Sequence, residues 1–97
     1  MGKVYYVKET YNNAFRIEKI YDLAGRIILH GTVTSGRIEP GMSGESNGKR
    51  FVIETIEVKN QRIDYLLENE AGDLIVKGVK TVKLEEEDFK PGQVLTF

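Results

Sequence analysis

Apolar and polar residues alternate along two stretches of the chain, residues 15–21 and residues 51–58. A repeat of two residues is typical of a β-strand that has one face on a hydrophobic core. The spacing of an amphipathic helix occurs clearly only over residues 61–68, where it covers about two helical turns. For residues 61–68 the sequence therefore predicts either a short helical turn or an irregular strand.

Turn-forming residues interrupt these segments at short intervals. They fall at Ala24-Gly25, Pro40-Gly41, Ser46-Asn47-Gly48, residues 69–73 and Lys90-Pro91-Gly92. Because this spacing is typical of all-β proteins, we predict an all-β fold, a small antiparallel β-barrel of six or seven strands with no helix longer than about two turns. The residues predicted to form its core are Val33, Ile53, Ile56, Leu74, Val76, Val94 and Leu95.

The most informative stretch is residues 31–41, which join a β-branched segment to glycines and close on a Pro-Gly pair. Threonine and valine favour an extended backbone, whereas Gly31 and Gly36 permit a bend or the close approach of another backbone. Pro40-Gly41 suits the central pair of a type II turn. The stretch predicts a curved strand that leads into a tight turn.

The spacing of this stretch, Gly-Thr-Val-x-(Ser/Thr)-Gly-Arg-(Val/Ile)-Glu-x-Gly, resembles the second domain of translational GTPases such as elongation factor Tu. Three other blocks of the sequence also resemble this family, and they occur in the family's order. Residues 15–21 are similar to its opening strand, residues 66–73 to its Ala-Gly-Asp turn and residues 90–95 to its closing strand. The resemblance covers residues 14–97 and implies the family's antiparallel β-barrel without the GTPase domain.

The length of 97 residues bounds the chain to a single domain with one modest core. Within that domain, residues 1–97, we expect residues 3–8 to form an extra strand before the barrel and residues 10–13 to connect it. Cysteine is absent, so no disulfide holds the core and packing alone must do so. Met1 does not distinguish a free-standing domain from a piece of a larger factor.

Two departures from the family pattern affect which of the family's binding properties can be expected of this chain. Residues 22–30 are longer than the family's Gly-Arg-Gly connection, and the strand after Gly41 is shortened to residues 42–45. In elongation factor Tu the loop after the opening strand helps form the pocket for the aminoacyl 3′ end of tRNA, so that pocket cannot be assumed for this chain. The resemblance also places Glu18 where the family's opening strand carries an acidic residue beside the pocket, which implies a binding role for Glu18.

Residues 44–50 lack the features of a phosphate-binding loop. Such a loop needs four residues between its glycines and a Ser or Thr after the lysine to hold magnesium. Here three residues separate Gly44 from Gly48, and Arg50 follows Lys49. The segment predicts an Asn-Gly hairpin turn instead, and we expect neither GTP binding nor any other cofactor.

The charge of the chain is small and unevenly spread. The formal net charge is -1, with eight Lys/Arg against six Asp/Glu in residues 14–62 and four against eight in residues 63–97. A chain without a basic excess binds phosphate backbones only through local contacts. The sequence has neither a long apolar run nor a secretory signal, so we expect a cytoplasmic protein that does not enter a membrane.

Residues for catalysis or metal binding are scarce. His30 is the only histidine, and without cysteine a metal site would have to rely on scattered carboxylates. Ser35 has no evident base to activate it. The acidic residues 85–88 lack the ligand spacing of a calcium loop and predict a solvated turn. We therefore expect no enzymatic activity and no metal.

Several residues are candidates for binding RNA. Arg37 can reach a phosphate or carboxylate with its planar donor fork, or it can pair with Glu39 or Glu18 on the surface. Aromatic residues can stack on bases or belong to the core; they are Tyr5, Tyr6, Tyr11, Tyr21 and Phe15. The complete set of predicted RNA-binding residues is Glu18, Arg26, His30, Gly31, Ser35, Arg37, Lys49 and Arg50.

The leading functional hypothesis is a non-catalytic binding module that contacts RNA, tRNA or the ribosome, and it depends on the likeness of fold. The alternative is a protein-interaction or scaffold barrel with no nucleic-acid role, which the acidic second half of the chain favours. The first hypothesis is supported by small cationic groups, namely Lys49-Arg50 and Arg26 with His30, which can contact nucleic acid. The same charges can also serve only to protect strand edges from aggregation.

Overall fold

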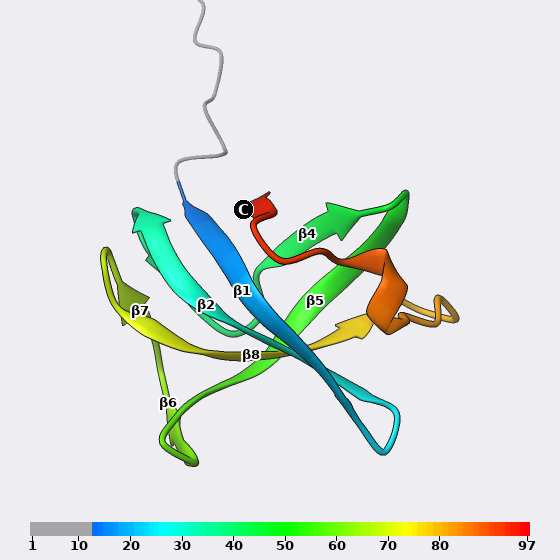
Figure 1. The fold of residues 1–97 in the computed structure, drawn as a ribbon, viewed down its shortest axis with the longest axis horizontal. Helices are drawn as coiled ribbons and strands as arrows, with labels where there is room; N and C mark the ends of the chain where they lie inside the picture. The colour runs from blue at the N-terminus through cyan, green and yellow to red at the C-terminus, as the bar shows by residue number, and fades with distance from the viewer. Residues whose placement is uncertain (1–12) are drawn as a thin grey trace, which may run out of the picture.

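The computed structural model describes residues 13–97, which form antiparallel strands of two to ten residues (Figure 1). The extra strand predicted over residues 3–8 lies outside the described residues. The elements in chain order are β1 (Ala14–Leu23), β2 (Arg26–Ser35), β3 (Arg37–Ile38), β4 (Ser43–Ser46), β5 (Lys49–Val58), β6 (Gln61–Ile63), β7 (Leu66–Leu67), β8 (Ala71–Gly78), the 3₁₀-helix η1 (Glu86–Asp88) and β9 (Val94–Thr96).

Seven of these strands form one sheet in the order β4-β5-β8-β2-β1-β9, with β6 paired to β5 beside this path. The remaining strands, β3 and β7, pair with each other. The two ends of the sheet, β4 and β9, come into contact, so the sheet curls into a nearly closed antiparallel barrel. The predicted all-β barrel is confirmed, and residues 61–68 contain two short strands rather than a helical turn.

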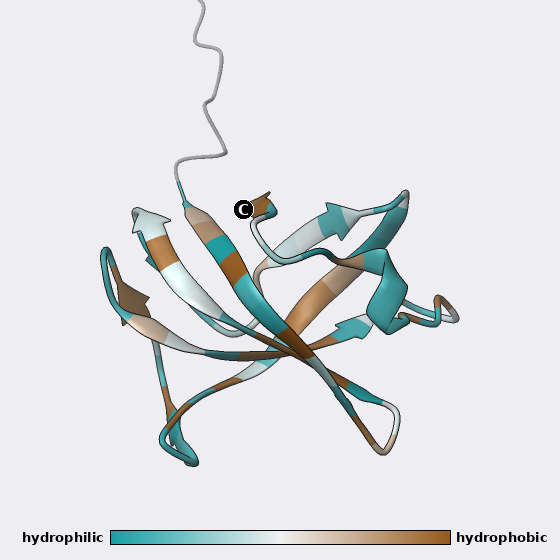
Figure 2. Cartoon of the chain, viewed as in Figure 1, coloured by the Kyte–Doolittle hydropathy of each residue, from teal (hydrophilic) through white to brown (hydrophobic). Residues whose placement is uncertain are grey.

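Apolar and polar residues alternate along β1, as its brown and teal bands show (Figure 2). The apolar side chains Phe15 and Ile17 of this strand are fully buried in the barrel. Phe51 lies within this core, and its ring packs edge-on against Phe89 and Phe97 at centroid distances of 5.5 and 6.0 Å. Six of the seven predicted core residues are confirmed, each no more than 3% exposed: Val33, Ile53, Ile56, Leu74, Val76 and Leu95.

The prediction is wrong for Val94, whose side chain is 51% exposed. Successive side chains of a strand point to opposite faces. Leu95 of β9 points into the hydrophobic core of the barrel, so its neighbour Val94 must face solvent.

The predicted turns are also present. Asn47 and Gly48 join β4 to β5 with positive φ angles of 54° and 76°, as a two-residue hairpin turn requires. Gly41 has a φ of 93°, and the amide of Met42 donates to the carbonyl oxygen of Glu39 at 3.3 Å. This is the type II turn that the Pro-Gly pair predicted.

The acidic segment before β9 differs from its prediction. Residues 85–87 are exposed, as a solvated turn would be, but Asp88 is buried. Its carboxylate accepts hydrogen bonds from Lys49 Nζ, Asn47 Nδ2 and the Glu85 amide, each at 2.8 Å. The backbone carbonyl of Asp88 accepts a further bond from Ser46 Oγ at 2.6 Å. Asp88 therefore fastens η1 to the β4–β5 hairpin.

This contact predicts a pH dependence of stability. Burial alone would raise the pKa of Asp88, but the hydrogen bonds from Lys49, Asn47 and Glu85 outweigh burial and hold the pKa below its ordinary value of 3.8. A lowered pKa in the folded state stabilises the fold above pH 3.8, and this contribution is lost as the pH falls through the folded value.

We expect Asp88→Asn to be less stable than the unchanged chain at about pH 6, and the difference to shrink by about pH 2.5. Urea unfolding at both pH values measures it. Glu86→Gln, which neutralises an exposed carboxylate of the same turn, is the matched control and should show little difference at either pH. If the difference in the free energy of unfolding between Asp88→Asn and the unchanged chain does not vary with pH, the stabilising role assigned to the Asp88 carboxylate is contradicted.

Candidate nucleic-acid interface

The alternation of β1 is interrupted where the strand passes β2. Ile17 pairs with Gly31 and Lys19 pairs with His30, so Glu18 is the extra residue of a β-bulge. As a result, the side chains of Glu18 and Lys19 are both exposed although they are neighbours in sequence. The bulge places Lys19 on the outer face of the barrel.

Beyond the bulge, the outer face holds a groove of about 490 Å³. Lys19, Tyr21 and Leu23 contribute to it from β1, and Arg26 and His30 from β2. These residues lie opposite one another across the two strands, because Lys19 pairs with His30 and Leu23 pairs with Arg26. The groove therefore combines two cations with an exposed tyrosine ring, since Tyr21 is 42% exposed.

His30 is held between carboxylates from two other strands. Its Nδ1 lies 2.7 Å from Asp73 Oδ1 on β8, and its Nε2 lies 3.9 Å from Glu18 Oε1. The other Glu18 oxygen accepts a hydrogen bond from Thr32 Oγ1 at 3.0 Å and lies 3.6 Å from the Arg16 guanidinium. This chain of contacts orients the imidazole at the end of the groove nearest the bulge.

Lys19 and Arg26, the cations of the groove, are not held by carboxylates as His30 is. Among the ion pairs of residues 13–97, none includes Lys19 or Arg26. Their charges are therefore available to an anionic ligand, such as an RNA phosphate.

Of the predicted residues, Arg26 and His30 line the groove, and Glu18 lies beside His30 at its edge. Gly31 follows His30 on β2. At Gly31 a Cβ atom would lie 2.0 Å from the carbonyl oxygen of Arg16. The predicted close approach of two backbones is confirmed there, and it gives Gly31 a role in strand packing. Ser35 lies at the far end of β2.

The other predicted cations lie away from the groove. Arg37 belongs to β3, where it pairs with Glu39, the first of its predicted partners, and its guanidinium lies 4.3 Å from the centroid of the Tyr65 ring. Arg50 lies on β5 opposite Glu45 of β4. The structure therefore does not gather the eight predicted residues into one site.

Lys49 is engaged within the fold. Its Nζ donates to the Asp88 carboxylate and, at 3.0 Å, to the carbonyl oxygen of Lys83. The hydrogen bond with Asp88 raises the pKa of Lys49. The ammonium group of Lys49 thus serves the contact between β5 and η1.

Sequence reasoning missed Lys19, which lines the groove with Arg26. The signal was the pair Glu18-Lys19, two successive polar residues that break the alternation of residues 15–21. Among the aromatic candidates, Tyr21 faces the groove, whereas Phe15 is fully buried and belongs to the core. The candidates Tyr5, Tyr6 and Tyr11 lie outside the described residues.

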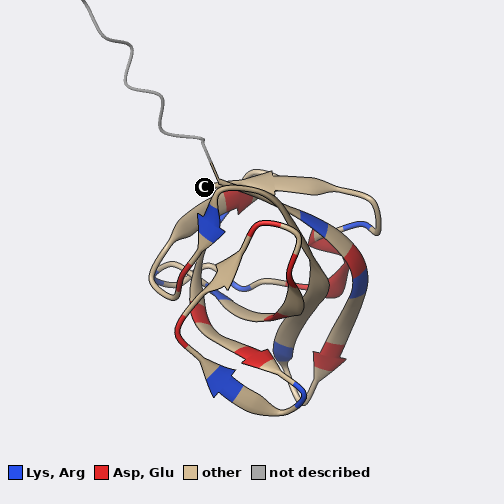
Figure 3. Cartoon of the chain, turned by 90° about the vertical axis from the view of Figure 1, so that its left-hand side faces the viewer, with Lys and Arg blue, Asp and Glu red and all other residues tan. Residues whose placement is uncertain are grey.

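Charges of both signs are interspersed around the barrel (Figure 3). Within residues 13–97, no group of three or more His, Asp or Glu side chains is arranged so that it could hold a metal ion. None of the helices in this same range has the length and apolar composition needed to cross a membrane.

The barrel resembles the second-domain β-barrel of translation factors, as residues 31–41 predicted. Its fold is similar to that in the crystal structure of the bacterial selenocysteine-specific elongation factor EF-Sec, with a TM-score of 0.72 and 9% sequence identity. The match covers 96% of this chain and 16% of the EF-Sec chain. No protein-family model and no curated protein sequence matches the chain. At this level of identity the likeness is one of fold.

Proposed function

We propose that this barrel is a non-catalytic RNA-binding module, and that it holds RNA in the groove on the outer face of β1 and β2. The observation that carries the proposal is the grouping of the unpaired cations Lys19 and Arg26 around the exposed ring of Tyr21. The translation-factor fold supports tRNA or ribosomal RNA as the source of the ligand.

Each part of the groove suits a different part of a single-stranded RNA. Lys19 and Arg26 attract phosphates, and the face of Tyr21 offers a stacking surface for a base. Oxygen atoms of Glu57 and Asp73, which also line the groove, can accept hydrogen bonds from a base or from a ribose hydroxyl. The same carboxylates repel phosphates, so the affinity is expected to be weak.

The groove also supports a binding role rather than a catalytic one. No serine, threonine or cysteine lines it to act as a hydroxyl or thiol nucleophile. A nucleophile with an adjacent base is therefore not assembled there. In this proposal the protein works in the cytoplasm, without GTP and without another cofactor.

Replacing both cations tests the proposal. We expect Lys19→Ser with Arg26→Ser to weaken the binding of a fluorescent single-stranded RNA, and to lower the slope of log affinity against log salt by about 0.7 for each lost phosphate contact. Tyr21→Ser should also weaken binding, by about 1 to 3 kcal/mol for one unstacked base, while leaving the salt slope unchanged.

The matched control is Lys83→Ser with Lys90→Ser, which removes two exposed cations outside the groove. Its affinity should remain close to that of the unchanged chain. If the control loses as much affinity as the groove variant, or if the unchanged chain does not bind RNA at about 100 μM and low salt, the groove is not an RNA site.

A further inference from the structure

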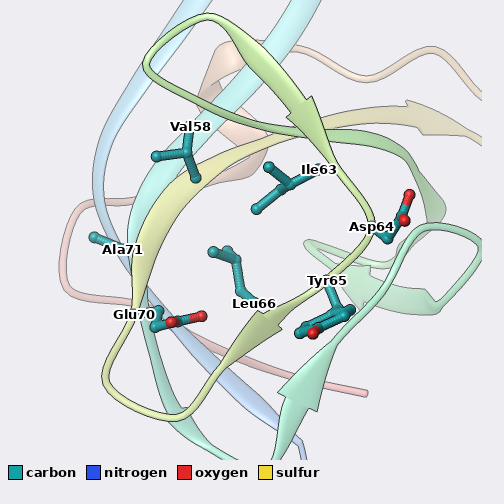
Figure 4. Close-up of a pocket in the computed structure, with 7 residues that line it drawn as sticks. All are labelled: Val58, Ile63, Asp64, Tyr65, Leu66, Glu70 and Ala71. Carbon is teal, nitrogen blue, oxygen red and sulfur yellow. The ribbon is translucent and has the colours of Figure 1, made fainter.

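A second groove, of about 670 Å³, lies where β5 ends and the segment from β6 to the start of β8 folds back beside it. Val58, Ile63 and Leu66 point toward its centre and Tyr65 stands at its side (Figure 4). Leu66 is buried, whereas Tyr65 is 44% exposed. The walls are thus apolar, and part of their surface is open to solvent.

Two carboxylates complete the lining of this second groove, those of Asp64 and Glu70. Neither forms an ion pair with another described residue. Glu70 is oriented by the amide of Leu67, which donates to Glu70 Oε1 at 2.8 Å. Arg37 reaches the Tyr65 ring, but its guanidinium is paired with Glu39. Two negative charges therefore remain without a cation beside an apolar surface.

The apolar walls and the two carboxylates of the second groove favour a ligand that carries both an apolar group and a positive charge. The carboxylates repel RNA phosphates, in contrast to Lys19 and Arg26 in the first groove, and the apolar walls gain free energy by covering an aliphatic or aromatic side chain. We propose that the second groove binds an extended segment of a partner protein in which an apolar side chain stands next to lysine or arginine. The two grooves would let one small barrel hold RNA and a protein through separate surfaces.

The probe for this proposal is a displayed library of random decapeptides, selected against the whole chain. The expected result is enrichment of peptides in which an apolar residue is adjacent to lysine or arginine. Asp64→Asn with Glu70→Gln keeps the shape of the lining and the acceptor for the Leu67 amide while removing both charges. An enriched peptide should bind this variant at least about fivefold more weakly, and added salt should weaken its binding to the unchanged chain.

Matched controls separate the groove from general electrostatics. Glu86→Gln with Glu87→Gln removes two exposed charges elsewhere, and Lys19→Ser with Arg26→Ser removes the RNA-binding cations, so both should leave peptide affinity unchanged. Enrichment without a basic residue, no enrichment, or equal losses in the Asp64/Glu70 and Glu86/Glu87 variants would overturn the proposal.

Residues 3–8 of the chain read Lys-Val-Tyr-Tyr-Val-Lys, which has the same chemistry as the proposed ligand. The enriched peptides are therefore also measured against the whole chain carrying Val4→Ser and Val7→Ser, which removes the apolar side chains next to Lys3 and Lys8. Unchanged affinity supports a separate partner. An increase of about tenfold or more would show that the chain's own segment competes for the groove, and it would overturn the assignment to a partner protein.

Discussion

Gly31→Ala is expected to lower the free energy of unfolding by about 3 kcal/mol, or to prevent folding altogether. An added Cβ atom would lie 2.0 Å from the carbonyl oxygen of Arg16 and 2.8 Å from the Phe15 ring. The carbonyl belongs to the neighbouring strand, so the clash can be relieved only by moving β1 away from β2. Urea unfolding followed by circular dichroism measures the loss.

Gly25→Ala is the control for this prediction. Gly25 has a φ of 84°, and nothing lies within 4 Å of an added Cβ atom. Its cost should therefore be the strain of a left-handed backbone, about 1 kcal/mol. If Gly31→Ala costs no more than Gly25→Ala, the close approach of β1 and β2 is not as tight as described.

Ile53→Ala is expected to cost about 2 to 4 kcal/mol, because the truncated side chain leaves a cavity in the core. Ile53 is 1% exposed and lies on β5. Val94→Ala, in contrast, changes a side chain that is 51% exposed and should alter the free energy of unfolding by no more than about 0.5 kcal/mol. Equal losses for the two variants would contradict the assigned faces of β5 and β9.

The sequence predicts the barrel well where local rules determine the structure. The alternation of residues 51–58 corresponds to the greater part of β5, and Asn47-Gly48 forms the hairpin turn that its dipeptide favours. The same rule of alternation, applied strictly, would have excluded Val94 from the core, because Leu95 beside it must take the opposite face.

These local rules do not predict contacts between residues that are far apart in the sequence. Asp88 lies in an acidic run whose composition favours solvent, and it is buried only because Lys49, 39 residues away, and Asn47 reach it. Neither pairing has a local signal in the sequence. The use of Lys49 as a structural cation could therefore not be predicted.

The candidate RNA groove was partly predictable. Arg26 and His30 form a small cationic group in the sequence, and the structure brings both to one groove. The contribution of Lys19 depends on the bulge at Glu18, which a one-residue break in alternation signals only weakly. The separation of Arg37 from the groove follows from its place in β3, outside the main sheet.

The most direct test of RNA binding is amide chemical-shift mapping of the isotope-labelled protein during titration with a short single-stranded RNA. We expect the largest shifts in β1 and β2, at Lys19, Tyr21, Leu23, Arg26 and His30, and we expect Lys19→Ser with Arg26→Ser to reduce them greatly. Absence of shifts at about 100 μM protein and low salt, or shifts centred on the groove of Asp64 and Glu70, would contradict the account.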